Sequence, residues 1–192
     1  MEFEPYDPES GEQPAPVQLF ISPGGDPERD PALIAARLLE AEETFAHLRG
    51  TPDDGAPTIV FLMRGVPKSK GGKQILGEMI APKLNGPTLQ QIAIWALARL
   101  CEGLPDYVMV LDAAWWSQAS PREREALVWH ELEHAWQERD KQGEPRFLPS
   151  GLPAWGIKPH DVSSFDSEVA RFGAWSPELR SFVGALRRGG AI

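Results

Sequence analysis

The feature that most constrains the chain is the segment 129–136, WHELEHAW, in which two histidines stand four positions apart. In an α-helix of about 3.6 residues per turn, His130 and His134 lie within roughly 40° of each other and one turn apart along the axis. Both imidazoles can then bind one metal ion, and with Glu131 they form the H-E-x-x-H pattern of a helical zinc site. The chain must therefore fold around a helix that leaves this histidine face accessible.

Glu131 has a separate role in this pattern. It lies about 100° around the helix from His130, too far to complete the same tetrahedron but close enough to reach a water molecule in an open coordination position. Zinc lowers the pKa of such a water toward about 7, and a neighbouring carboxylate then accepts its proton as the water attacks a carbonyl. We therefore expect Zn2+ as the cofactor and Glu131 as a general base.

A catalytic zinc site needs a third protein ligand. His160 is the strongest choice, because it follows a turn-rich segment that redirects the chain and stands before a further predicted helix. Asp161, Asp166 and Glu168 remain alternatives: Glu168 as a glutamate ligand from that helix, and Asp161 more simply as its N-cap. We expect His47, far upstream, to be a surface or partly buried residue outside the site.

Turn residues and apolar spacing divide the chain into helices and strands. Helices are predicted at residues 30–49, 88–102, 120–139, 162–172 and from 176 onward. The zinc helix has a well-defined start, because Ser120 and Glu123 form a capping box with proline at the first helical position. Apolar runs predict strands at residues 58–63, 74–80 and 107–111. The expected class is α+β, with a small mixed or antiparallel sheet packed against helices.

The first 26 residues differ in composition from the rest. They are rich in proline and acidic, so we predict a flexible tail over residues 1–26, in which residues 17–21 form either an added strand or an anchor. Residues 27–192 are long enough for a single globular domain with its own core. Cys101 is the one cysteine, which excludes an internal disulfide.

The charge and hydropathy of the chain limit its partners. A formal net charge of -9 argues against nucleic acid or an anionic membrane surface, because phosphate binding draws on clustered Lys and Arg. No apolar run approaches the roughly eighteen residues of a membrane span, and the first residues do not resemble a secretory signal. We expect a cytoplasmic protein that acts on a protein or peptide substrate.

The zinc motif, the segment 158–165 (KPHDVSSF) and the pair Phe172-Gly173 together resemble the phage-type zinc metallopeptidases, small zincin-like proteins encoded in phages and prophages. The resemblance covers roughly residues 30–175. It implies a minimal zincin-like fold with an H-E-x-x-H active-site helix, and it supports His160 as the third ligand. In zincins an exposed strand edge pairs with an extended peptide, and residues 73–80 and 107–111 are the candidates for that strand here.

Three functions fit these residues. The first is a zinc-dependent peptidase with Glu131 as its base. The second is a non-catalytic zinc-containing adaptor that binds a partner through its acidic surface or tail. The third is a phage-associated amidase or peptidoglycan hydrolase, which needs a route out of the cytoplasm such as phage lysis machinery. Glu131 favours catalysis, because a purely structural zinc site has no use for a carboxylate beside an open position.

Overall fold

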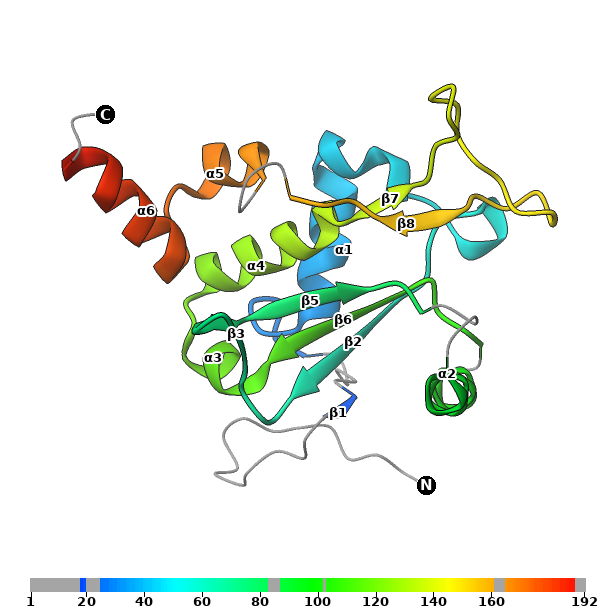
Figure 1. The fold of residues 1–192 in the computed structure, drawn as a ribbon, viewed down its shortest axis with the longest axis horizontal. Coiled ribbons are helices and arrows are strands. Elements are labelled where there is room, and N and C mark those ends of the chain that lie inside the picture. The colour runs from blue at the N-terminus through cyan, green and yellow to red at the C-terminus, as the bar shows by residue number, and fades with distance from the viewer. Residues whose placement is uncertain (1–17, 20–24, 83–86, 102, 161–164, 189–192) are drawn as a thin grey trace.

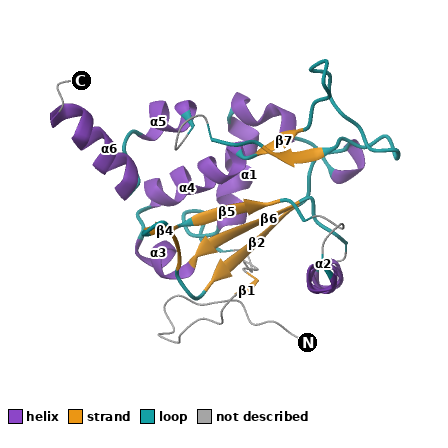
Figure 2. Cartoon of the chain, viewed as in Figure 1, coloured by secondary structure: helices purple, strands orange, loops and turns teal. Residues whose placement is uncertain are grey.

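A mixed four-stranded sheet with the order β1-β2-β6-β5 forms the centre of the computed structural model (Figure 1). The structure describes residues 18–19, 25–82, 87–101, 103–160 and 165–188. β2 (Ile59–Arg64) and β6 (Tyr107–Asp112) run parallel, and β1 (Gln18–Leu19) and β5 (Gly77–Ile80) flank them in the antiparallel sense. Several helices and small sheets with antiparallel as well as parallel strand pairs make up the fold (Figure 2), which confirms the α+β class.

The central strand β6 is buried along all six of its residues. Its near-continuous apolar sequence, YVMVLD, is typical of a strand covered on both faces. The predicted strands at residues 58–63 and 107–111 are confirmed. The predicted stretch 74–80 is instead divided between two sheets, because β4 (Lys73–Ile75) turns back on β3 (Lys68–Lys70) before β5 begins.

Two helices cover one side of the sheet and pack on each other, α1 (Pro31–Ala41) and α4 (Pro121–Glu133) (Figure 1). The helix predicted over residues 30–49 is shorter than expected. Glu42 adopts an extended backbone that ends α1, and the chain continues as the 3-10 helix η1 (Glu43–Leu48), followed by η2 (Pro52–Asp54). This break brings the ring of Phe45 into the core, 4.8 Å from that of Trp129.

The helix that carries the two motif histidines also ends earlier than the predicted range 120–139. α4 begins at the expected capping box but stops at Glu133, and His134 is its C-cap residue with a helical backbone. The chain then forms β7 (Ala135–Gln137), which pairs antiparallel with β8 (Trp155–Ile157). Both histidines still lie on one helical turn, so the early end leaves their spacing intact.

The hydroxyl of Tyr107 explains where this helix ends. It donates a hydrogen bond to the carbonyl oxygen of Gly156 at 2.7 Å and accepts one from the amide of Trp136 at 3.2 Å. Tyr107 is fully buried, and burial raises the pKa of its phenol. Tyr107, in the distant strand β6, thus holds Trp136 in the β7–β8 ribbon. This tertiary contact outweighs the helical propensity of the residues after His134.

The turn-rich segment ahead of His160, which connects β7 to β8, forms an extended hairpin. Isolated bridges pair Arg139 with Pro145 and Phe147 with Pro153. The hairpin projects from the body at the right of Figure 1, and Phe147, Leu148 and Leu152 are exposed along it.

Two helices follow the β7–β8 ribbon, α5 (Asp166–Phe172) and α6 (Pro177–Arg188). The prediction placed the start of the first at residue 162, with Asp161 as its cap. Phe165 has an extended backbone at the N-cap position, so the helix begins at Asp166. Asp161 lies outside the described residues.

Two further helices remain. α3 (Ala113–Gln118) directly follows β6. α2 (Thr88–Leu100) matches the predicted range 88–102 closely and stands at the side of the sheet opposite α6 (Figure 1). Ile94 is its buried residue among the side chains described, whereas Ile92 and Trp95 are 55% and 63% exposed.

Part of the predicted tail belongs to the sheet. Gln18 and Leu19 form β1 and pair with β2, so the run at residues 17–21 contributes an added strand. Residues 1–17 lie outside the described residues. The division of the chain into a tail of residues 1–26 and one domain of residues 27–192 stays a prediction.

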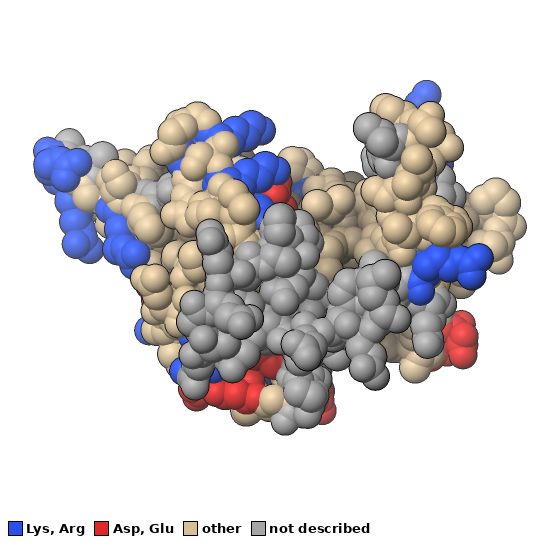
Figure 3. Space-filling model, turned by 90° about the horizontal axis from the view of Figure 1, so that it is seen from below, with Lys and Arg blue, Asp and Glu red and all other residues tan. Residues whose placement is uncertain are grey.

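The surface charges do not follow a single pattern. Viewed from below, the Lys and Arg side chains form separate groups, one at the end that carries α6 and another at the opposite end (Figure 3). Arg187 and Arg188 stand in the last turn of α6. Among the helices that the structure describes, none is long and apolar enough to cross a membrane.

Candidate metal centre

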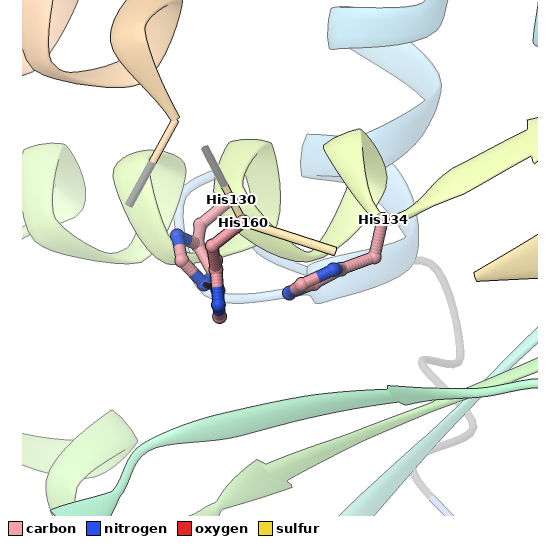
Figure 4. Close-up of side chains that lie close together, drawn as sticks. All are labelled: His130, His134 and His160. Carbon is pink, nitrogen blue, oxygen red and sulfur yellow. Dashed lines mark hydrogen bonds between the residues drawn. The ribbon is translucent and has the colours of Figure 1, made fainter. Parts of the chain in front are cut away.

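His130, His134 and His160 come together at the end of α4 (Figure 4). Each offers one ring nitrogen, and these three atoms all lie within 4.8 Å of one another. Two of the rings come from the last turn and the C-cap of the helix, and the third comes from the segment after β8. The structure thus brings together the three histidines that the sequence predicted as metal ligands.

Backbone hydrogen bonds tie the segment that carries His160 to the helix. The amide of Lys158 donates to the carbonyl oxygen of His134 at 2.8 Å. In the other direction, the carbonyl oxygen of Lys158 lies 2.7 Å from Nδ1 of the His134 ring. A carbonyl can only accept, so Nδ1 of His134 carries the proton and its Nε2 keeps a lone pair for a metal.

A buried carboxylate holds the ring of His130 in the same way. Oε2 of Glu168 lies 2.7 Å from Nδ1 of His130, and the Glu168 side chain is fully buried. It also accepts hydrogen bonds from the indole of Trp175 and from the amide of Phe165. Glu168, one of the alternative third ligands, therefore lies behind the His130 ring, the position from which a carboxylate can orient a metal-binding histidine.

Phe165 packs against all three rings of the cluster. Its ring centroid lies 5.3 Å from that of His130, 4.9 Å from that of His134 and 5.2 Å from that of His160, and the residue is buried. The sequence predicted no role for Phe165, which stood out only as the last residue of the segment 158–165. Its position in the cluster depends on the fold of the chain around α4 and has no local signature.

The donor set fits a divalent transition metal. Three imidazole nitrogens suit zinc and leave a fourth position open. Two nitrogens bound to one tetrahedral zinc stand about 3.4 Å apart, given metal–nitrogen distances of about 2.0 to 2.1 Å. The Nε2 atoms of His130 and His160 are 2.9 Å apart, and all three ligand nitrogens lie within 4.8 Å of one another, so the three rings surround a space of the size that one ion needs.

Glu131 is buried beside this cluster, against β5. The backbone amide of Met79 on β5 faces its carboxyl group and lowers its pKa. Within the described part of the chain one carboxylate oxygen, Oε2, is buried without a hydrogen-bond partner. Burial raises the pKa of this carboxyl to about 7, although the charge of His130 and the Met79 amide oppose the shift. A buried carboxylate with one oxygen left over suits a proton acceptor.

The two motif histidines respond differently to their surroundings. Burial lowers the pKa of His134 to about 4, which favours the neutral imidazole that binds metals. Burial also disfavours the charged form of His130, but its hydrogen bond to Glu168 and the neighbouring carboxylates outweigh that effect and raise its pKa. Protonation therefore opposes metal binding more strongly at His130 than at His134.

The other candidates lie elsewhere. Nε2 of His47 is 3.1 Å from the carbonyl oxygen of Ala135, so this ring stays apart from the cluster, as expected. A cavity of about 410 Å³ is lined by His47, Glu133 and Lys158 among others, but by none of the three clustered histidines. Asp166 begins α5, and Asp161 lies outside the described residues.

Comparison with known proteins identifies the family. A family model described as "Putative phage metallopeptidase" matches residues 27–187, which is most of the chain. No curated protein and no solved structure matches. The matched residues include every element from α1 to nearly the end of α6, together with the three clustered histidines. The chain belongs to the phage metallopeptidase family.

Proposed function

We propose that this protein is a zinc-dependent peptidase in which His130, His134 and His160 hold the metal and Glu131 is the general base. The observation that carries the proposal is the convergence of three imidazoles on one point, two of them with Nδ1 already occupied by an acceptor. The family is described as a metallopeptidase family, and such an enzyme acts on protein or peptide substrates.

The residues divide the chemistry between them. When bound, zinc supplies Lewis acidity that polarises a carbonyl and acidifies water. Glu131 then removes a proton from the attacking water at Oε2, the oxygen without a partner among the described residues, and returns it to the amine that leaves. Glu168 and the carbonyl oxygen of Lys158 keep two of the ligand rings oriented throughout.

The edge strand β5 is the proposed binding site for the substrate backbone. The other candidate, β6, pairs with β2 on one side and with β5 on the other, so it has no edge to offer. The amide of Asp112 donates to the carbonyl oxygen of Leu76, and this register directs the backbone groups of Gly77 and Met79 away from β6. An extended peptide can add to the backbone groups of Gly77, beside Glu131.

The proposal extends to fold and setting. A mixed sheet with an antiparallel edge strand beside the helix of the motif supports a minimal zincin-like fold. The family match over residues 27–187 supports a single catalytic domain. The phage family also supports action in the cytoplasm of a bacterial host.

Metal content and peptide cleavage, measured on the same purified samples, test the proposal. Wild type should contain one equivalent of zinc and cleave members of a broad peptide library. His160→Ala should lose most of the zinc, because two imidazoles alone bind the metal far less tightly. Glu131→Gln should keep the zinc and lose cleavage. The matched control is His47→Ala, which removes the one histidine outside the cluster and should change neither property.

Two results contradict this assignment. Zinc that persists at one equivalent in His160→Ala rules out this histidine as the third ligand. Zinc bound at one equivalent by a wild type that cleaves no peptide rules out the peptidase and favours a non-catalytic zinc protein.

A further inference from the structure

Gly77 on β5 faces the carboxylate of Glu131. A Cβ built on Gly77 stands 2.5 Å from Oε1 and 3.0 Å from both Cδ and Cγ of Glu131, and these are its three nearest atoms. Real Cβ atoms essentially never approach another heavy atom closer than 3.0 Å. Any side chain at this position therefore displaces the Glu131 carboxylate.

The backbone gives no other reason for a glycine here. Gly77 lies in a regular strand, paired with Leu111, and is not among the glycines with positive φ. A residue with a side chain can adopt these dihedral angles without strain. What the glycine provides is space beside the strand.

The same strand brings a backbone amide to the carboxylate. Met79 follows two positions after Gly77, so the two residues face the same side of β5. The amide of Met79 faces the Glu131 carboxyl, and Oε2 has no hydrogen-bond partner among the described residues. Oε1 is the atom that a Cβ on Gly77 approaches most closely.

We propose that Gly77 is a positioning residue for Glu131: its missing side chain leaves a slot beside β5 that the Glu131 carboxylate fills. The catalytic meaning of this slot rests on the proposed role of Glu131 as general base. Alanine at position 77 displaces the carboxylate from this slot, while His130 and His134 keep their hydrogen bonds to Glu168 and Lys158.

A double-mutant cycle in thermal stability tests the contact without reference to activity. Gly77→Ala, Glu131→Ala and the double variant are prepared as full chains and their Tm values compared with wild type. Gly77→Ala should lower Tm by about 5 °C, because it overpacks a buried site. In the Glu131→Ala background the same change should lower Tm by less than about 1 °C, because the methyl group enters vacated space. Equal losses in the two backgrounds overturn the inference.

Gly156→Ala is a matched control. A Cβ on this second strand glycine stands 2.7 Å from Cγ of Glu138, but that side chain is about one-third exposed and can move aside. We expect its Tm loss to be smaller than that of Gly77→Ala, and its zinc content and cleavage rate to match wild type.

Kinetics and metal content complete the test. Gly77→Ala should keep one equivalent of zinc and lose at least about tenfold in kcat with little change in KM, because the base alone is displaced. Added to Glu131→Ala, it should lower the residual rate no further. A Gly77→Ala variant with wild-type kcat contradicts the inference. If the wild type cleaves no peptide, that result contradicts the proposed function instead. The Tm cycle then still decides whether Gly77 positions the Glu131 carboxylate.

Discussion

The two 13-residue helices α4 and α2 reverse the usual relation between composition and burial. α4, PREREALVWHELE, is rich in charged residues and yet buries Arg124 and Glu131. α2, TLQQIAIWALARL, has a single charged residue, Arg99, and yet exposes Ile92 and Trp95. Hydropathy alone therefore does not decide which helix belongs to the core.

The difference between the two helices lies in the hydrogen-bond partners of their polar side chains. The guanidinium of Arg124 donates to three backbone carbonyl oxygens, those of Trp116, Ser117 and Glu28. A buried polar group is stable when its hydrogen bonds are made inside the protein. α4 can therefore be buried with its charges, and the metal centre gains a helix fixed on several sides.

The largest effect should come from Glu131→Gln in α4. Loss of the general base should reduce peptide cleavage by about 10² to 10⁴-fold at unchanged zinc content. In α2, Trp95→Ala should leave the rate within about twofold of wild type. Steady-state rates on one peptide check both variants, and comparable losses from the two would remove the functional distinction between the helices.

The two arginines sharpen the comparison in stability. Each guanidinium carbon lies 5.8 Å from the centre of a tryptophan ring, Arg124 over Trp116 and Arg99 over Trp95. Arg124→Met should cost about 3 kcal/mol of unfolding free energy, because buried carbonyls lose a charged donor. Arg99→Met, at the surface, should cost about 0.5 kcal/mol or less. Urea unfolding measures both; similar costs would mean that the carbonyl contacts of Arg124 add little.

Glu168 tests whether the metal face of α4 is held from outside the helix. Glu168→Gln removes the charge behind His130 and should weaken zinc binding by about 10 to 100-fold. Glu125→Gln, which removes a carboxylate of α4 that pairs with Arg37, is the control and should change affinity by less than about twofold. Competition with a chromophoric chelator gives both affinities. An unchanged affinity in Glu168→Gln would leave this carboxylate with a packing role alone.

The smallest expected effect concerns the helix starts. α4 has a capping box, whereas Pro87 at the start of α2 offers no side-chain cap. Ser120→Ala should cost about 1 kcal/mol.

The same capping box adds a pH dependence. The backbone amide and hydroxyl of Ser120 donate to Glu123 and lower its pKa below 4.5. Because the unfolded chain then binds more protons, this stabilisation is present above about pH 4.5 and is lost as the pH falls through the lowered pKa. Urea unfolding of wild type and Glu123→Gln should therefore differ at pH 7 and converge near pH 3. A constant difference at both pH values would exclude the titration of Glu123 as its source.

The convergence of the three histidines could be predicted from the sequence because it depends on local features. His130 and His134 need only a helix between them, and His160 needs only the chain reversal that precedes it. The start of α4 was equally local, since a capping box and a proline specify it within four residues.

Other features depend on contacts between distant residues and left no local trace. The end of α4 is set by Tyr107, which lies almost thirty positions before Trp136. Glu168 was an alternative ligand in the sequence, and only the packing of α5 and Trp175 places it behind His130. Gly77 carries no local signal either, because the reason for a glycine there is the close approach of β5 to Glu131 of α4.

The clamp that Tyr107 forms at the base of the β7–β8 hairpin has a consequence for engineering. Both ends of the hairpin are hydrogen-bonded to the same Tyr107 hydroxyl, so the chain leaves and re-enters the body of the protein at fixed points. Each doubling of such a loop costs only about 0.6 kcal/mol in closure entropy. The tip of the hairpin is thus a suitable site for inserting a peptide tag or reporter domain, because an insertion there leaves the histidines before and after the hairpin in place.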